Sequence, residues 1–280
     1  MNQMLDPRLL RAFVAVIDDA GFTRAAERLH MTQSTISQQI ARLEDQLGQP
    51  LIDREARPLR MTPAGERLAG YARRILALQH EASLALCDPA GTVPIRIGLA
   101  EDILTTQMAR LFAGFTAAHR QAQLDVTSGL SLALKARYRS GEFDIVVVKE
   151  AASDADCRLS FPEPIGWFEA EAAAPWPSPL PFVTFPPGGL YRDQMFARAL
   201  SEGFKWYTAF SGSSLPNVLT AVEAGLGLSL LPLRTAKDRK LRLSRLFGTE
   251  PGMVTSLYAW ESDGPAAPLV AAMGQVLAHR

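Results

Sequence analysis

Cysteine, histidine and net charge are all scarce in this sequence of 280 residues. Two cysteines, Cys87 and Cys157, are too few for a disulfide scaffold or a four-cysteine zinc site. The four histidines are dispersed, and no two have the spacing of metal ligands, so we expect no metal and no cofactor. The 29 basic and 29 acidic residues cancel, so the bulk charge favours neither nucleic acid nor a membrane as partner.

Long apolar runs are also missing. Ile145–Val148 is only strand-sized, and nothing approaches the roughly 18 apolar residues of a membrane helix. The first ten residues lack an apolar stretch and contain Asp6 and Arg8, unlike a signal peptide. We therefore expect a cytoplasmic protein with no membrane partner and reduced thiols. Cys157 is expected to be a passive thiol, and a redox switch is the alternative.

The hydrophobic pattern changes near Cys87, in a chain long enough for about two domains. Residues 1–87 are mainly helical in pattern and contain eleven arginines, no lysine and ten acidic residues. This region is therefore only marginally cationic, and its function must be inferred from its pattern. After the turn-rich residues 88–91, strands and helices alternate, which predicts an α/β domain.

Three helices are expected before Gly48. Gly21 ends the first, Thr23 is placed to cap the second, and Thr32 is placed to cap the third, which Gly48 ends. The small pair Ala25-Ala26 would let the second helix cross the third closely. This close crossing is typical of a helix-turn-helix.

The outward face of the third helix has an unusual composition. No acidic residue occurs between Gln33 and Leu43, whereas a helix selected only for solubility usually carries Glu and Lys. Hydroxyls, amides and one guanidinium occur there instead. Glutamine can pair with adenine and arginine with guanine, so this face suits base edges.

Residues 51–62 read as two short strands around a turn that contains Arg54, Arg57 and Arg60. This pattern predicts a β wing whose guanidinium groups contact phosphates or enter the minor groove. Because Asp53 and Glu55 lie between the arginines, a solvated charged hairpin is the alternative.

A long helix follows, capped by Thr62 and opened by Pro63. Its apolar residues alternate steps of three and four, a heptad seam that predicts dimerisation. The seam consists of Leu68, Tyr71, Ile75, Leu78, Ala82 and Ala85. A helix buried against its own domain is the alternative. We favour a dimer because a recognition helix needs a second copy to read a two-fold operator.

Residues 5–87 resemble the winged helix-turn-helix and linker helix of LysR-type transcriptional regulators. The resemblance rests on GFTRAAERLHMTQSTISQQI at positions 21–40 and LRMTPAG at positions 59–65. It implies a helix-turn-helix from about Phe22 to Ala41, with Gln33, Ser34, Thr35 and Gln38 facing bases and Arg54 in the wing contact. The full expected DNA-binding set is Thr32, Gln33, Ser34, Thr35, Ser37, Gln38, Arg42, Arg54, Arg57 and Arg60.

In the C-terminal region, a β-α-β-α-β order over residues 95–149 predicts a largely parallel sheet with right-handed crossovers. The runs GEFDIVV at 141–147 and EAGLGLSLLP at 223–232 resemble the effector half of the same family, two α/β lobes similar to periplasmic binding proteins. The expected organisation is a DNA-binding domain (5–62), a linker helix (63–87), a hinge (88–93) and an effector domain (94–280). Lobe I covers about 94–165 and 244–280, and lobe II about 166–243. The Pro-rich stretch 151–181 is expected to shorten lobe II.

Ligands of open α/β sheets lie outside the carboxyl ends of the strands. This rule places the effector site at Ala100, Glu101, Asp102, Gly129, Leu130, Ser131, Lys149, Phe185, Ser211, Ser213 and Ser214. At Glu101-Asp102 the chain departs from the family, where hydroxyls are frequent. Two carboxylates would repel an anion unless Lys149 or Arg192 compensates. We expect Asp102 to cap the following helix.

The expected function is that of a regulator bound to an inverted-repeat operator in double-stranded DNA, with a small-molecule effector of unknown identity between the lobes. The chain is expected to form a homodimer that pairs into a tetramer. The alternative is an α/β enzyme with an accessory helix-turn-helix. We nominate no catalytic residue, because the sequence contains no HExxH or GxSxG motif and no convergent nucleophile and base.

Overall fold

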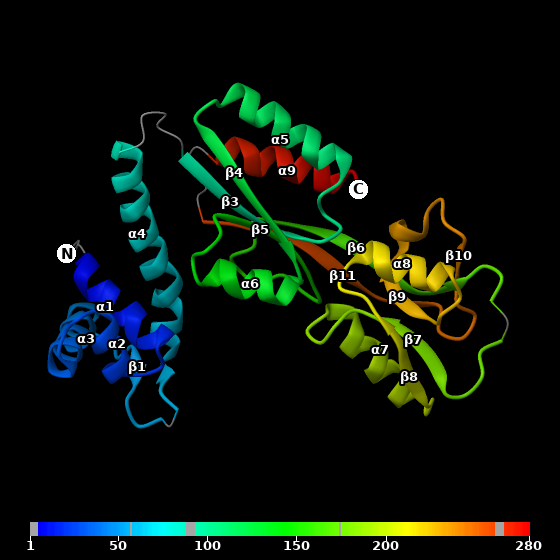
Figure 1. Cartoon of the computed structure of the whole chain (residues 1–280), viewed down its shortest axis with the longest axis horizontal. Helices are drawn as coiled ribbons and strands as arrows, with labels where there is room; N and C mark the ends of the chain where they lie inside the picture. The colour runs from blue at the N-terminus through cyan, green and yellow to red at the C-terminus, as the bar shows by residue number, and fades with distance from the viewer. Residues whose placement is uncertain (1–4, 57, 88–92, 174, 261–265) are drawn as a thin grey trace. The chain divides into compact units, whose positions relative to one another are not determined.

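The structure is a computed structural model of residues 1–280, and it describes all of them except 1–4, 57, 88–92, 174 and 261–265 (Figure 1). The side chains of 80, 81, 83–87 and 93 also lie outside the description. The chain divides into two compact units. One comprises residues 1–93, 121–123 and 137–143, and the other residues 94–120, 124–136 and 144–280.

The N-terminal unit consists of four helices and a two-stranded hairpin. In chain order these are α1 (Pro7–Asp18), α2 (Phe22–Arg28), α3 (Gln33–Leu47), β1 (Ile52–Asp53), β2 (Arg60–Met61) and α4 (Pro63–Cys87). Its core joins Phe13 of α1, Ile36 and Ile40 of α3 and Ala72 of α4, all fully buried. The strand pair β1–β2 is antiparallel, as a wing requires.

The ends of α3 confirm the sequence prediction. The Thr32 hydroxyl accepts the N–H of Thr35, and Gly48 takes a left-handed φ of 66° at the other end. The expected cap of α2 is wrong, because α2 begins two residues earlier than a Thr23 cap requires. Its N-cap is Gly21, which has no side chain to offer. Burial of Ala25 and Ala26 lets α2 and α3 pack closely.

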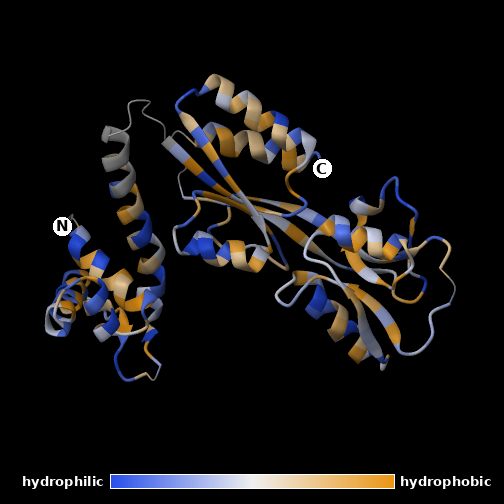
Figure 2. Ribbon diagram, in the orientation of Figure 1, coloured by the Kyte–Doolittle hydropathy of each residue, from blue (hydrophilic) through white to orange (hydrophobic). Residues whose placement is uncertain are grey.

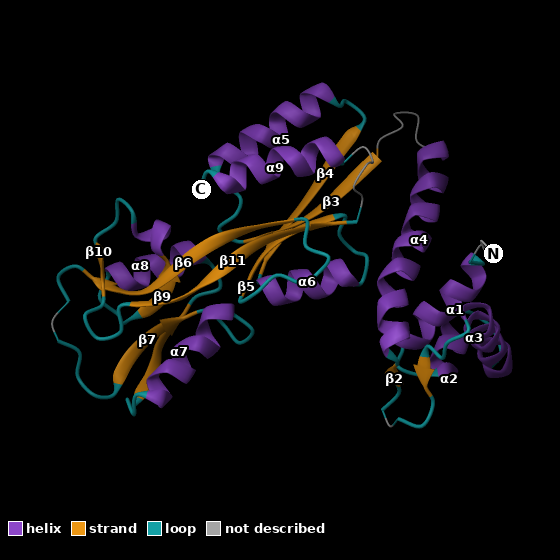
Figure 3. Ribbon diagram, turned by 180° about the vertical axis from the view of Figure 1, so that it is seen from behind, coloured by secondary structure: helices purple, strands orange, loops and turns teal. Residues whose placement is uncertain are grey.

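A seven-stranded sheet forms the framework of the second unit. Its strands are β3 (Val93–Ala100), β4 (Ala122–Gly129), β5 (Ile145–Glu150), β6 (Leu159–Ala170), β9 (Ser229–Pro232), β10 (Leu241–Leu243) and β11 (Thr249–Ala259). Their order is β10-β6-β11-β5-β3-β4, and β9 pairs with β6. On one face lie α5 (Thr106–Ala118) and α9 (Ala267–Ala278), and on the other lies α6 (Ser131–Arg139) (Figure 3).

A smaller parallel pair, β7 (Leu180–Thr184) and β8 (Trp206–Ser211), packs with α7 (Leu190–Ser201) and α8 (Leu215–Glu223). We call β3, β4, β5, α5, α6 and α9 the first lobe, and β7, β8, β9, α7, α8 and the short 3-10 helix η1 (Leu233–Ala236) the second lobe. Apolar residues gather along the strands and on the helix faces that cover them (Figure 2). The second lobe has its own aromatic core, in which Trp167 stacks on Phe247 with ring centroids 4.2 Å apart.

The sheet is mixed rather than largely parallel. Strands β3 and β5 are parallel, but β11 runs antiparallel to both β5 and β6. The stretch 151–181 was predicted only to shorten lobe II, whereas it contains the twelve-residue strand β6. The sequence did not predict this strand because Pro162 and Pro164 occur in it, and proline is unfavourable in most strands. Both prolines precede Ile165, where the pairing of β6 with β9 begins. In this part of β6 the strand pairs with β11 on one side alone, so a proline without an N–H is tolerated. Strands β6 and β11 extend through both lobes (Figure 1).

Candidate functional site

The polar face of α3 is exposed in the structure. Gln33, Ser34, Gln38 and Arg42 are exposed, and Thr35 and Ser37 are half-buried. The opposite face is closed by fully buried Ile36, Ile40 and Leu43. The Thr32 hydroxyl lies 2.8 Å from the hydroxyls of both Ser34 and Thr35, so hydroxyl groups surround the start of the helix.

The hairpin is attached to α3 through Glu44, which sequence reasoning missed. One oxygen of Glu44 accepts the backbone N–H groups of Leu51 (2.8 Å) and Ile52 (3.3 Å), and the other accepts Nη2 of Arg54 at 3.0 Å. Glu44 on α3 thereby orients the side chain of Arg54 in the hairpin. Arg60 is exposed, and Arg57 lies outside the described residues.

The predicted seam on α4 divides into two kinds of position. Leu68 and Ile75 are half-buried against the core of their own domain. Tyr71 is 59% exposed, Leu78 is 43% exposed, and Ala82 is exposed as well. The side chain of Ala85 lies outside the described residues. Tyr71, Leu78 and Ala82 are therefore the seam positions that the domain's own core leaves at the helix surface.

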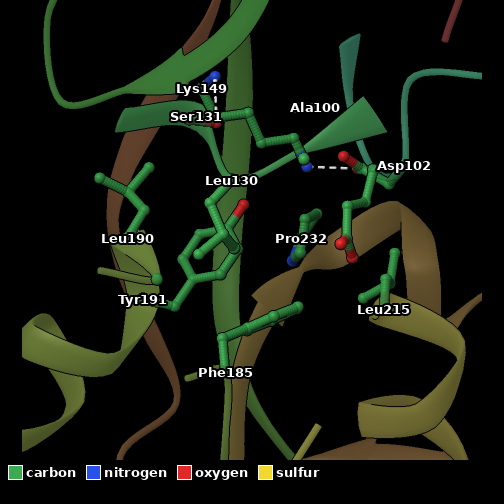
Figure 4. Close-up of a pocket in the computed structure, with 13 residues that line it drawn as sticks. Ala100, Asp102, Leu130, Ser131, Lys149, Phe185, Leu190, Tyr191, Leu215 and Pro232 are labelled. Atoms are coloured by element: carbon green, nitrogen blue, oxygen red, sulfur yellow. Dashed lines mark hydrogen bonds and ion pairs between the residues drawn. The ribbon is translucent and has the colours of Figure 1, made fainter. Parts of the chain in front are cut away.

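A small cavity of about 50 Å³ opens between the lobes of the second unit (Figure 4). Eight predicted effector-site residues line it: Ala100, Glu101, Asp102, Gly129, Leu130, Ser131, Lys149 and Phe185. The predicted Ser211, Ser213 and Ser214 do not line it, and Ser214 instead caps α8 by accepting the N–H of Asn217. Sequence reasoning missed Gly189, Leu190, Tyr191, Leu215 and Pro232. Leu190, Tyr191 and Leu215 are among the first residues of α7 and α8, and Gly189 is the N-cap of α7. The start of a helix often faces ligands, so this position could have signalled all four.

Three cations and two carboxylates form a buried ion cluster beside the cavity. Lys149 contacts Asp102 directly and lies 3.6 Å from Glu163. Arg234 contacts Asp102 and donates to both oxygens of Glu163 at 2.8 and 3.2 Å. Arg280 donates to the backbone carbonyl of Asp102. Because Arg234 belongs to the second lobe and Asp102 to the first, the cluster links the two lobes.

These contacts decide the protonation of the cluster. Burial raises the pKa of Asp102, but the charges of Lys149 and Arg234 outweigh it and bring the pKa to about 2. Burial lowers the pKa of Lys149 despite the attraction of Asp102 and Glu163. The expectation that Asp102 caps the next helix is wrong, because Thr105 caps α5. Asp102 is instead the carboxylate that neutralises Lys149.

Two polar groups in the cavity lack a hydrogen-bond partner among the described residues. Tyr191 is 6% exposed, and its hydroxyl is unpaired. Burial raises the pKa of this phenol well above its ordinary value, and Asp102 and Glu163 add to the effect, so it stays neutral. The second group is Oε2 of Glu101, which is buried and also unpaired. Burial raises the pKa of Glu101, opposed by a hydrogen bond from the backbone of Leu215.

Metal chemistry has no support in the part of the chain that the structure describes. No group of three or more His, Cys, Asp or Glu side chains there could hold a metal ion. In the same part of the chain, no helix is long and apolar enough to span a membrane.

Comparisons with known proteins agree with this arrangement. Residues 7–66 match the family model described as bacterial regulatory helix-turn-helix protein, lysR family, and residues 91–280 match the LysR substrate binding domain. The chain is 29% identical over 232 residues to the regulator DgdR of Burkholderia cepacia, covering 82% of this chain and 79% of DgdR. It is 30% identical over 252 residues to PecT of Dickeya dadantii, covering 89% and 78%. Among solved structures, ArgP of Mycobacterium tuberculosis is similar, with 25% identity, a TM-score of 0.62 and coverage of 98% and 97%.

Proposed function

Because the chain belongs to the LysR family of DNA-binding transcriptional regulators, we propose that α3 reads base edges in the major groove of an operator. The effector domain is a regulatory module, and the alternative of an α/β enzyme is wrong, since the family and the relatives are regulators.

The observation that carries the proposal is the exposed, acid-free face of α3. Gln33, Ser34 and Gln38 present amide and hydroxyl groups on a helix that is anchored by its buried face. Amides and hydroxyls pair with base edges, while an acidic group would be repelled by phosphates. Arg42, Arg54 and Arg60 supply the positive charge that phosphates require.

The wing completes the interface. Glu44 fixes the hairpin and Arg54 to α3, so the guanidinium is positioned beside the helix that reads bases. We assign Arg54 a backbone or minor-groove contact. Its loss is expected to weaken binding to most sequences about equally.

A two-fold arrangement follows from the exposed seam. Tyr71 and Leu78 on α4 offer the apolar surface for a second copy of the chain, and two copies would read an inverted repeat. We propose a homodimer that pairs into a tetramer and acts in the cytoplasm.

The cavity between the lobes is the proposed effector site. A small molecule that binds there changes how the lobes close, and this alters the setting of the DNA-binding domains and the bending of the operator. The effector can shift the equilibrium only by its difference in affinity for the two arrangements.

Binding to duplex DNA at increasing salt tests the function, because phosphate contacts predict a steep loss of affinity. Gln38→Ala tests the base-reading role. We expect discrimination at one base position to fall by about 1–3 kcal/mol. Gln46→Ala, an exposed glutamine later on α3, is the control and should leave discrimination unchanged. Equal weakening on operator and random DNA by Gln38→Ala would contradict the assignment.

A further inference from the structure

The charges that line the cavity are not equally available to a ligand. Three charged residues line it, Glu101, Asp102 and Lys149. Lys149 and Asp102 contact each other, and Glu163 and Arg234 complete their surroundings. Arg192, the other expected counter-charge, donates to the carbonyl of Phe185 at 3.4 Å and stacks over Phe196. Lys149 and Asp102 are engaged with each other, whereas Glu101 is the charged residue of the cavity wall whose carboxylate keeps a buried oxygen without a partner among the described residues.

The carboxylate of Glu101 is suited to bind a cation. Its Oε2 atom is buried without a partner, although the backbone of Leu215 at the start of α8 bonds to the carboxylate. A buried carboxylate oxygen without a donor is costly, and an ammonium group would supply both the charge and the hydrogen bond. Burial also disfavours the ionised form of this carboxylate, and a bound cation would stabilise that form.

The opposite side of the cavity, at the start of α6, is suited to bind an anion. The cavity wall includes Gly129, Leu130 and Ser131, where the nine-residue helix α6 begins. The first N–H groups of a helix have no partner within it and carry partial positive charge. The Ser131 hydroxyl accepts the backbone N–H of Lys149 at 3.0 Å and keeps its own O–H to donate. The unpaired hydroxyl of Tyr191 is a further donor, and the tyrosine ring projects into the cavity between Leu130 and Phe185 (Figure 4).

The remaining wall is apolar. Leu130, Phe185, Leu190, Leu215 and Pro232 surround the polar groups. Such a lining excludes a second charged group on the ligand and favours a hydrocarbon side chain. A dicarboxylate would bring one negative charge to Glu101, and a simple amine would leave the Tyr191 hydroxyl unpaired.

We propose that the effector is a small α-amino acid with an aliphatic side chain. Its ammonium group binds the Glu101 carboxylate, its carboxylate binds the start of α6 and the hydroxyl of Tyr191, and its side chain packs on the apolar wall. This inference rests on the proposed function, since it takes the cavity to be the effector site.

Calorimetry on the full chain tests the proposal with matched probes. The amino acids are L-alanine, L-valine, L-leucine and L-norvaline. Pentanoate is norvaline without the amine, and butylamine is norvaline without the carboxylate. We expect at least one amino acid to bind, and norvaline to bind at least tenfold more tightly than pentanoate or butylamine. If no amino acid of the four binds, or if pentanoate matches norvaline, the proposal is overturned.

Two variants assign the contacts. Glu101→Gln should abolish the advantage of norvaline over pentanoate, and Tyr191→Phe should weaken norvaline and pentanoate by a similar factor. Glu171→Gln and Tyr207→Phe, both exposed positions, are the matched controls. Thermal melting confirms that each variant is folded. Binding of the wild-type chain to DNA is measured in the same preparations. Salt-sensitive DNA binding without amino-acid binding refutes this inference alone, whereas absence of DNA binding refutes the proposed function.

Discussion

Neutralising Asp102 should cost the effector domain a measurable part of its stability. The ordinary pKa of 3.8 falls to about 2 in the folded protein, because Lys149 and Arg234 outweigh the effect of burial. At about 1.4 kcal/mol for each pKa unit, the ionised side chain contributes about 2 kcal/mol. Asn resembles the protonated acid, so Asp102→Asn should lower the free energy of unfolding by about 2 kcal/mol at pH 7.

Acid is expected to remove the contribution of Asp102 to stability, because its pKa is lower in the folded protein than in the unfolded chain. A carboxyl group with a lowered folded pKa contributes its full stabilisation above pH 4, and this is lost as the pH falls toward 2. Urea unfolding at pH 7 and pH 3 measures the difference between wild type and Asp102→Asn, which should shrink by about half at pH 3. The exposed Asp156 supplies the control, and Asp156→Asn should change stability by less than about 0.5 kcal/mol. An equally stable Asp102→Asn protein, or a difference that does not shrink in acid, would show that the ion cluster does not stabilise the fold.

Two further predictions concern the N-terminal unit. Thr32→Ala removes the cap of α3 and should cost about 1 kcal/mol of unfolding free energy in urea, whereas Thr23→Ala, which removes no cap, should cost less; equal losses would contradict the capping role. Replacing Tyr71 and Leu78 together by Glu should shift sedimentation of the full chain toward the monomer, because charges would be buried in the proposed dimer seam. Gln79→Glu, on an exposed part of the same helix, should leave the oligomer intact, and an unchanged oligomer in the double variant would place the interface elsewhere.

Local sequence signals predicted the N-terminal unit well. Thr32 and Gly48 act on their immediate neighbours, so the limits of α3 follow from a few adjacent residues. The first-lobe part of the cavity was predictable for a similar reason. Ala100, Gly129 and Lys149 lie at or near the carboxyl ends of β3, β4 and β5, where a simple rule of sheet geometry places ligands.

Long-range contacts explain what the sequence did not predict. Arg234 is 132 residues from Asp102, and Arg280 is 178 residues from it, so no spacing rule links them. The role of Asp102 therefore depends on the tertiary fold. Tyr191 and Leu215 enter the cavity from the starts of α7 and α8. Which side of these helices faces the cavity depends on how the second lobe packs, and the sequence does not show that packing. Glu44 was missed because two of its three partners are backbone N–H groups, which leave no sign in the sequence.

The two long strands that pass from lobe to lobe limit how this domain can deform. Since β6 and β11 are hydrogen-bonded to each other over most of their length, neither lobe can slide independently of the other. Their register shifts between Glu250 and Met253, opposite Ile165 and Glu163, and a strand bends and twists more strongly at such a bulge. This irregular point lies beside Glu163, a member of the ion cluster. A change in the contacts of Glu163 would therefore act at the place where the strand pair that joins the lobes is least regular.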